Sequence, residues 1–164
     1  MNTQKNTITL TEEKSDVALR EEAVLAFWKE HDIFNKSLEK EAPKGDFIFY
    51  DGPPFATGLP HYGHILAGSR KDAIPRVWTM NGYRVPRTWG WDCHGLPLEN
   101  LIEKKLGLAT KRDIEEYGVK NFNEQAREAV LEYADDWRKI IPRMGRFVDM
   151  ENDYKNMDST YTES

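Results

Sequence analysis

Two histidines three residues apart carry the clearest chemical signal in this sequence of 164 residues. His61 and His64 enclose Tyr62 and Gly63, and the stretch before them is rich in glycine and proline. If a helix starts here, both imidazoles project from one side of its first turn, beside backbone N–H groups that have no partner within the helix. Those groups and the helix dipole favour an anionic ligand such as phosphate. Because Gly63 has no side chain, a flat ring could lie against its backbone.

Two other interpretations of the histidine pair stay open on the spacing alone. Zinc sites commonly use three or four protein ligands, and His94 could supply a third. However, no cysteine pair or acidic triad converges on the pair in the sequence. The histidines could also do no more than cap a helix. We expect no protein-bound metal in this segment.

The elements that must position this pair begin with a helix and an extended segment. Ser15 or Asp16 can cap a helix that runs to about His31. Residues 46–50 are predicted to form a short buried strand. That strand must end at residues 51–54, because two prolines there cannot donate hydrogen bonds to a sheet.

A long helix is predicted to follow the histidines. It begins at residues 62–64 and continues to about Met80, and Pro75 should kink or interrupt it. Gly82 can end it in a left-handed conformation. The residues at a spacing of four that we expect on one face are Ile65, Ser69, Ala73 and Val77.

A second strand and a second loop follow this helix. Residues 83–89 are a candidate strand, and residues 90–95 form a loop just after it. The next helix opens with Pro97 in its first turn and closes at Gly107.

The last predicted helix runs from a capping box at residues 121–124 to Ile141, and residues 149–164 are polar and lack periodicity. The order strand, helix, strand, helix predicts an α/β fold with a parallel sheet. Ligands of open α/β sheets bind beyond the carboxyl ends of the strands. The loop before the histidine pair and the loop at residues 90–95 should therefore both lie on the ligand side of the sheet.

Composition sets wider limits on the class of protein. Hydrophobic residues make up 39% and charged residues 31%, which is typical of one folded domain rather than of a disordered chain. The net charge is −5, and basic and acidic residues are interspersed, so no basic face for nucleic acid is evident. We see no secretory signal and no membrane span. Cys93 is the only cysteine, which excludes an intrachain disulfide, and we expect a cytoplasmic location.

Several motifs resemble those of the class I aminoacyl-tRNA synthetases. Pro53 and Pro54 followed by residues 61–64 resemble the first signature of that family, usually His-Ile-Gly-His, with Tyr62 at its variable position. Residues 90–99 resemble a block typical of the isoleucine-specific members, whereas leucine and valine members read differently there. Two further stretches, residues 25–34 and 144–149, match the same family, so the resemblance covers the chain from about Glu21.

The resemblance implies a site for ATP, bound with Mg²⁺ as substrate, and for isoleucine. In this family the amino-acid carboxylate attacks the α-phosphorus of ATP, and the acyl group then moves to tRNA. The residues implied to be catalytic are His61 and His64. Those implied to bind ATP are Pro54, His61, Gly63 and His64. Those implied to bind the amino acid are Gly52, Pro53 and Asp92, the last as acceptor for the ammonium group.

The same resemblance implies how the chain is divided. We expect a mobile leader at 1–14, an N-terminal helical segment at 15–45, the first half of a Rossmann-like nucleotide-binding domain at 46–150, and a polar tail at a truncation point at 151–164. The second ATP signature, an editing insertion and an anticodon-binding domain are not found in these residues. We therefore expect a fragment with weak activity or none alone, which acts on tRNA(Ile) through the complete enzyme and has the missing half as a partner.

Other functions compete with this one. A truncated, non-catalytic relative that serves as a binding module is the main alternative from another class of protein. A fragment of a leucine or valine enzyme is the alternative within the family. A generic nucleotidyltransferase would explain the histidine loop but not residues 90–95.

Overall fold

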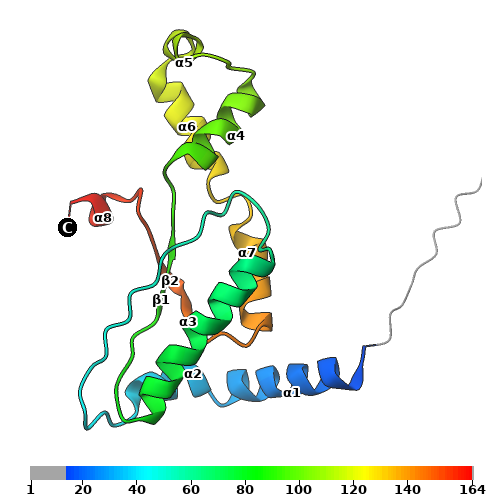
Figure 1. Ribbon diagram of the computed structural model, residues 1–164, viewed down its shortest axis with the longest axis vertical. Coiled ribbons are helices and arrows are strands. Elements are labelled where there is room, and N and C mark those ends of the chain that lie inside the picture. Colours follow the sequence, from blue (N-terminus) through cyan, green and yellow to red (C-terminus); the bar gives the residue numbers. More distant parts are fainter. Residues whose placement is uncertain (1–13, 164) are drawn as a thin grey trace, which may run out of the picture.

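The computed structural model describes residues 14–163, so that most of the proposed leader lies outside the described residues. The described part contains eight helices and two strands (Figure 1). They are, in chain order, α1 (Asp16–Glu30), α2 (Ile33–Glu39), α3 (Tyr62–Met80), β1 (Thr88–Trp91), α4 (Leu96–Leu106), α5 (Lys111–Tyr117), α6 (Val119–Ala129), α7 (Ala134–Arg143), β2 (Asp149–Lys155) and α8 (Ser159–Thr162).

The strands confirm the predicted parallel sheet, and β1 pairs with β2 between Thr88 and Asp149 and between Gly90 and Tyr154. In Figure 1, α3 runs beside these strands, while α4, α5 and α6 form an arm that projects from one end. The opposite end is crossed by α1.

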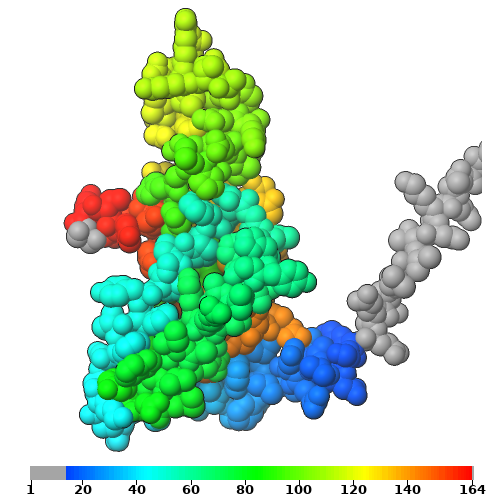
Figure 2. All heavy atoms as spheres, in the orientation of Figure 1, coloured from blue at the N-terminus to red at the C-terminus, as the bar shows by residue number. Residues whose placement is uncertain are grey.

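The prediction of a buried strand at residues 46–50 is wrong. Only Asp46 makes a bridge there, to Arg84, and the chain next touches the β1 region at the parallel bridge between Phe55 and Asp92. Phe47 still donates its N–H to the carbonyl of Arg84 at 2.8 Å, but residues 48–54 belong to no strand, and Tyr50 is 91% exposed. Figure 2 shows this segment, in cyan, on the surface beside α3. Hydrophobic side chains predict burial here, but no strand among residues 14–163 covers the outer side of the segment.

The strand predicted at residues 83–89 begins later, at Thr88, and extends to Trp91. Residues 149–155, which have no hydrophobic periodicity, form β2 rather than an irregular tail. A packing contact explains this pairing. A Cβ atom at Gly90 would overlap the ring of Tyr154, so that the glycine leaves room for the β2 side chain directly opposite it.

The helix that carries the histidines starts and stops as predicted, but it does not break at Pro75. It runs without interruption from Tyr62 to Met80, and Gly82 adopts a positive φ of 92° after it. The buried positions of α3 are Gly68, Pro75 and Thr79, and none of the four residues spaced at four is among them. Burial of the proline ring in the core accompanies the loss of one helix hydrogen bond.

The predicted single helix at residues 121–141 is two helices, α6 and α7. The chain turns between them, where the backbone N–H of Tyr133 donates to the carbonyl of Ala56 at 3.2 Å. The capping box at residues 121–124 is also wrong, since Gly118, with φ of 95°, precedes the first residue of α6. By contrast, the cap of α1 is confirmed, because the Ser15 side chain accepts from the N–H of Ala18.

The core lies where the strands, α4, α6 and α7 meet. Three tryptophans, Trp89, Trp91 and Trp137, are at most 2% exposed and pack within about 6 Å of one another. Trp137 of this cluster contacts the first predicted ligand loop at Gly58, and Trp91 belongs to the second. Among residues 14–163, no helix combines the length and the apolar character that crossing a membrane requires.

Candidate active site

The two predicted histidines lie together at the start of α3 and cap that helix reciprocally. The N–H of Gly63 donates to Nδ1 of His61 at 3.1 Å, and the N–H of His61 donates to Nδ1 of His64 at 3.2 Å. The two rings stack, with 3.8 Å between their centroids. The two histidines therefore do cap the helix, and this does not exclude a role in ligand binding.

These caps fix which nitrogen of each ring can face a ligand. A backbone N–H can only donate, so Nδ1 of each neutral histidine must be the acceptor and Nε2 must carry the proton. Both Nε2–H groups are then donors. They lie at the N-terminal end of α3, where the helix dipole favours an anion such as phosphate.

The surroundings of His64 favour its neutral form. Burial lowers the pKa of His64, and the neighbouring His61 and Lys71 lower it further. One face of its ring packs against Trp137, with 4.9 Å between centroids. At neutral pH this residue is therefore a hydrogen-bond donor rather than a cation.

Gly63 is required by the cap itself. A Cβ atom at this position would lie 2.9 Å from Cε1 and 3.0 Å from Nδ1 of His61. Carbon atoms in folded proteins do not approach so closely, so a side chain here would displace the imidazole. The sequence indicates an open backbone for a flat ring, and the structure adds this second reason for glycine.

Asp92 lies at the end of β1 and is held by a residue that the sequence analysis missed. Its Oδ1 accepts from Nδ2 of Asn156 at 2.9 Å and from the N–H of His94 at 3.2 Å. Asn156 also accepts from the N–H of Cys93 at 2.8 Å. Asn156 directly follows β2, and a polar residue at the carboxyl end of a parallel strand is the signal that could have found it.

A single hydrogen bond joins the two loops. The N–H of Asp92 donates to the carbonyl of Pro54 at 2.9 Å, beside the bridge between Phe55 and Asp92. A second contact ties the first loop to the core, since Nε1 of Trp137 donates to the carbonyl of Gly58 at 2.8 Å. Both loops thus lie at the same end of the strands.

The remaining predicted residues, Gly52 and Pro53, lie just before this junction. Gly52 is exposed and its carbonyl accepts from Nζ of Lys71 at 2.9 Å, while Pro53 is half-buried. The preceding residue, Asp51, pairs with Lys71 and with Arg146. Arg146 lies in the stretch 144–149 that resembles the family, whereas no sequence motif indicated a role for Asp51 or Lys71.

Cys93 and His94, whose roles the sequence left open, differ in exposure. Cys93 is 4% exposed, and burial raises the pKa of its thiol, so it is a poor nucleophile. His94 is exposed and lines a groove of about 260 Å³ with Glu99 and Arg127. Within residues 14–163, no group of three acidic, histidine or cysteine residues could hold a metal ion.

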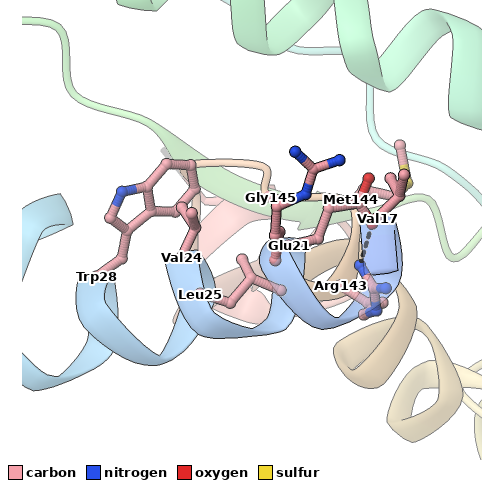
Figure 3. A pocket seen from close by; sticks show the side chains of 9 residues that line it. Val17, Glu21, Val24, Leu25, Trp28, Arg143, Met144 and Gly145 are labelled. Carbon is pink, nitrogen blue, oxygen red and sulfur yellow. Dashed lines mark hydrogen bonds and ion pairs between the residues drawn. The ribbon is translucent and has the colours of Figure 1, made fainter. Parts of the chain in front are cut away.

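Another groove, of about 490 Å³, lies between α1 and the turn after α7 (Figure 3). Its apolar walls include Val24, Leu25 and Trp28, and an ion pair between Glu21 and Arg143 spans it at 3.0 Å. None of the predicted site residues lines it. It is separate from the two loops.

Several proteins resemble this chain closely in sequence. Isoleucine–tRNA ligase of Treponema denticola is 56% identical over 151 residues, which cover 92% of the chain and 14% of that protein. Isoleucine–tRNA ligase 2 of Pseudomonas fluorescens is 57% identical over 144 residues, and the ligase of Chlamydia caviae is 54% identical over 151 residues. The chain thus spans about 14% of the length of these relatives.

A structural relative supports the same fold. The LeuRS in a crystal structure of the ternary complex of Agrobacterium radiobacter K84 agnB2 LeuRS, tRNA and LeuAMS superimposes with a TM-score of 0.55. The identity is 23%, and the match covers 90% of this chain and 16% of that one. A family model described as tRNA synthetases class I (I, L, M and V) matches residues 23–164. The chain belongs to this family of class I tRNA synthetases.

Proposed function

We propose that these residues supply the first half of a site that forms isoleucyl-adenylate from isoleucine and ATP. The observation that carries the proposal is the hydrogen bond from Asp92 to Pro54, because it brings a carboxylate to the loop that leads to the histidine pair. The isoleucine–tRNA ligases among the relatives, at 54–57% identity, support isoleucine as the amino acid.

The ATP side of the site is His61, His64, Gly63 and Pro54. The two Nε2–H groups donate to phosphate oxygens, on which negative charge develops as the isoleucine carboxylate attacks the α-phosphorus. A donor of this kind, aimed at developing charge, contributes roughly 3 kcal/mol to the transition state in other enzymes. Mg²⁺ arrives with ATP as part of the substrate.

The amino-acid side is Gly52, Pro53 and Asp92. Oδ1 of Asp92 is already held by Asn156 and His94, and its Oδ2 accepts no hydrogen bond from residues 14–163. That oxygen is available to the substrate ammonium group, whose charge makes the bond strong. The protein provides no covalent nucleophile, so catalysis here is alignment and charge stabilisation.

The activity of the 164 residues by themselves is weak or absent in this proposal. No run resembling the family's second ATP signature is present in the sequence, so the pyrophosphate lacks its expected lysines. Transfer to tRNA(Ile) takes place in the complete enzyme, in the cytoplasm. Parts beyond these residues complete the site and act with this half.

Calorimetric titration with a non-hydrolysable isoleucyl-adenylate analogue tests the proposal. We expect saturable binding that is preferred over the valyl and leucyl analogues. Binding should be lost in His64→Ala and Asp92→Asn and kept in Asp135→Asn, whose carboxylate is 89% exposed. Absence of binding in a folded chain contradicts the proposal. Binding of the analogue without preference for isoleucyl favours the binding-module alternative.

A further inference from the structure

We propose that Lys71 is a positioning residue that fixes the Gly52–Pro53–Pro54 loop, with Asp51 and Arg146 as its electrostatic partners. The inference rests on the proposed function only in naming that loop as the floor of an amino-acid pocket. The geometric part stands on the ligand-free chain alone.

The loop has few ways to be held in place. Proline has no N–H, so neither Pro53 nor Pro54 can donate a backbone hydrogen bond. At these two residues only the carbonyl oxygens can form backbone hydrogen bonds. The carbonyl of Pro54 accepts from Asp92, and the carbonyl of Gly52 accepts from Nζ of Lys71 at 2.9 Å. Lys71 therefore supplies the anchor at one end of the loop, and β1 supplies the anchor at the other.

The ammonium group of Lys71 is itself held in place by an ion pair. Its Nζ lies 2.5 Å from Oδ1 of Asp51, the residue directly before Gly52. The other oxygen of Asp51 pairs with Arg146, whose side chain is only 7% exposed. A carboxylate between two cations, itself 18% exposed, is a far more rigid arrangement than a surface pair.

Arg146 belongs to a segment that is fastened to α3. The N–H of Phe147 donates to Oδ1 of Asp72 at 2.8 Å, and Arg76 pairs with the same Asp72 at 2.6 Å. Arg76 also donates to the carbonyl of Gly145. The side chains of α3 at positions 71, 72 and 76 thus hold both the loop and the 145–147 segment.

This arrangement places both sides of the candidate site on one helix. His64 lies in the first turn of α3, and Lys71 follows seven residues later, about 10 Å along the axis. The helix that presents the histidines to phosphate also fixes the pocket floor through Lys71. We infer that the distance between the two sides depends on this lysine.

The test is the backbone order of the loop in the ligand-free chain, measured by ¹⁵N relaxation at the amides of Gly52 and Phe55. Lys71→Met should loosen both amides and leave the amides of Gly63 and His64 unchanged. Lys71→Arg, which keeps the charge and a donor, should restore most of the order. Lys139→Met is the matched control, since it removes an exposed lysine that pairs with Asp136 at 3.2 Å.

Affinity for the isoleucyl-adenylate analogue should follow the same ranking and fall by about tenfold in Lys71→Met, as expected for loss of one charged hydrogen bond. Unchanged order at Gly52 in Lys71→Met overturns the inference, as does an unchanged affinity. If Lys71→Met does not fold, Lys71→Gln replaces it under the same criteria. If the unaltered chain binds no analogue, the proposed function fails, and the relaxation comparison still decides the role of Lys71.

Discussion

The histidine loop and the Asp92 loop lie at the same end of the strands but are built in opposite ways. The hydrogen bonds that form the histidine cap join residues two and three positions apart, although Trp137 holds the loop before it through Gly58. Besides a local bond from His94, Asp92 and Cys93 are held by Asn156, more than 60 residues later in the chain. The histidine cap is organised by neighbouring residues, whereas the position of Asp92 depends on the pairing of β1 with β2.

This difference predicts how each loop responds to substitutions elsewhere in the chain. The histidine cap should survive changes in the sheet, because its partners lie within one turn of helix. The Asp92 loop should be lost whenever β2 moves. Substitutions in the sheet therefore separate the two loops.

The largest expected effect comes from Gly90→Ala. A Cβ atom there overlaps the Tyr154 ring, so the ring must move, either by changing its rotamer or together with β2 and Asn156. Overpacking of this kind should lower the free energy of unfolding by about 3 kcal/mol, measured by urea denaturation. Gly58→Ala is the control, since nothing lies within 4 Å of its added Cβ. Equal stability of the two variants would show that the strand contact is wrong.

Asn156→Ala should have the next largest effect. It leaves the N–H of Cys93 without its acceptor and Asp92 without one of its two donors. Loss of a partly buried polar partner should destabilise the chain by about 2 kcal/mol. We expect the imidazole resonances of His61 and His64 to stay unchanged in NMR spectra. Shifts there as large as those at Asp92 would contradict the separation of the two loops.

A smaller effect is expected for His61→Ala, which removes the cap of α3. Loss of an N-cap acceptor should lower the free energy of unfolding by about 1 kcal/mol. His61→Asn restores a good capping side chain but not the Nε2–H donor, so it should recover the stability without recovering analogue binding. Full recovery of binding in His61→Asn would show that the histidine acts only as a cap.

The smallest effect is a pH dependence from His64. Its pKa in the folded chain lies below the ordinary value of 6.5, so the unfolded chain binds the proton more readily. Its contribution to stability is fully present above pH 6.5 and is lost as the pH falls from there toward the lowered pKa. Urea denaturation at pH 7.5 and 5.5 should show a smaller pH difference in His64→Gln than in the unaltered chain. If the change in stability between the two pH values is the same in both chains, the pH dependence comes from other groups.

The same contrast explains what could be predicted from the sequence. The helix start at Tyr62 and the glycine after α3 follow from local patterns, which the structure confirms. The polar strand β2, the break before α7 and the partners Asn156 and Lys71 depend on contacts between distant residues. Tyr154 opposite Gly90 has no signature in either stretch alone, because the fit exists only after the strands pair.

The central claim is that the two loops form one half-site joined through Pro54 and Asp92. NMR titration of the chain with the isoleucyl-adenylate analogue tests it most directly, with the amides of Gly63 and Asp92 as reporters. If the loops act as one site, both resonances shift along a single binding curve with one dissociation constant. Saturation of one reporter while the other does not move would contradict the claim.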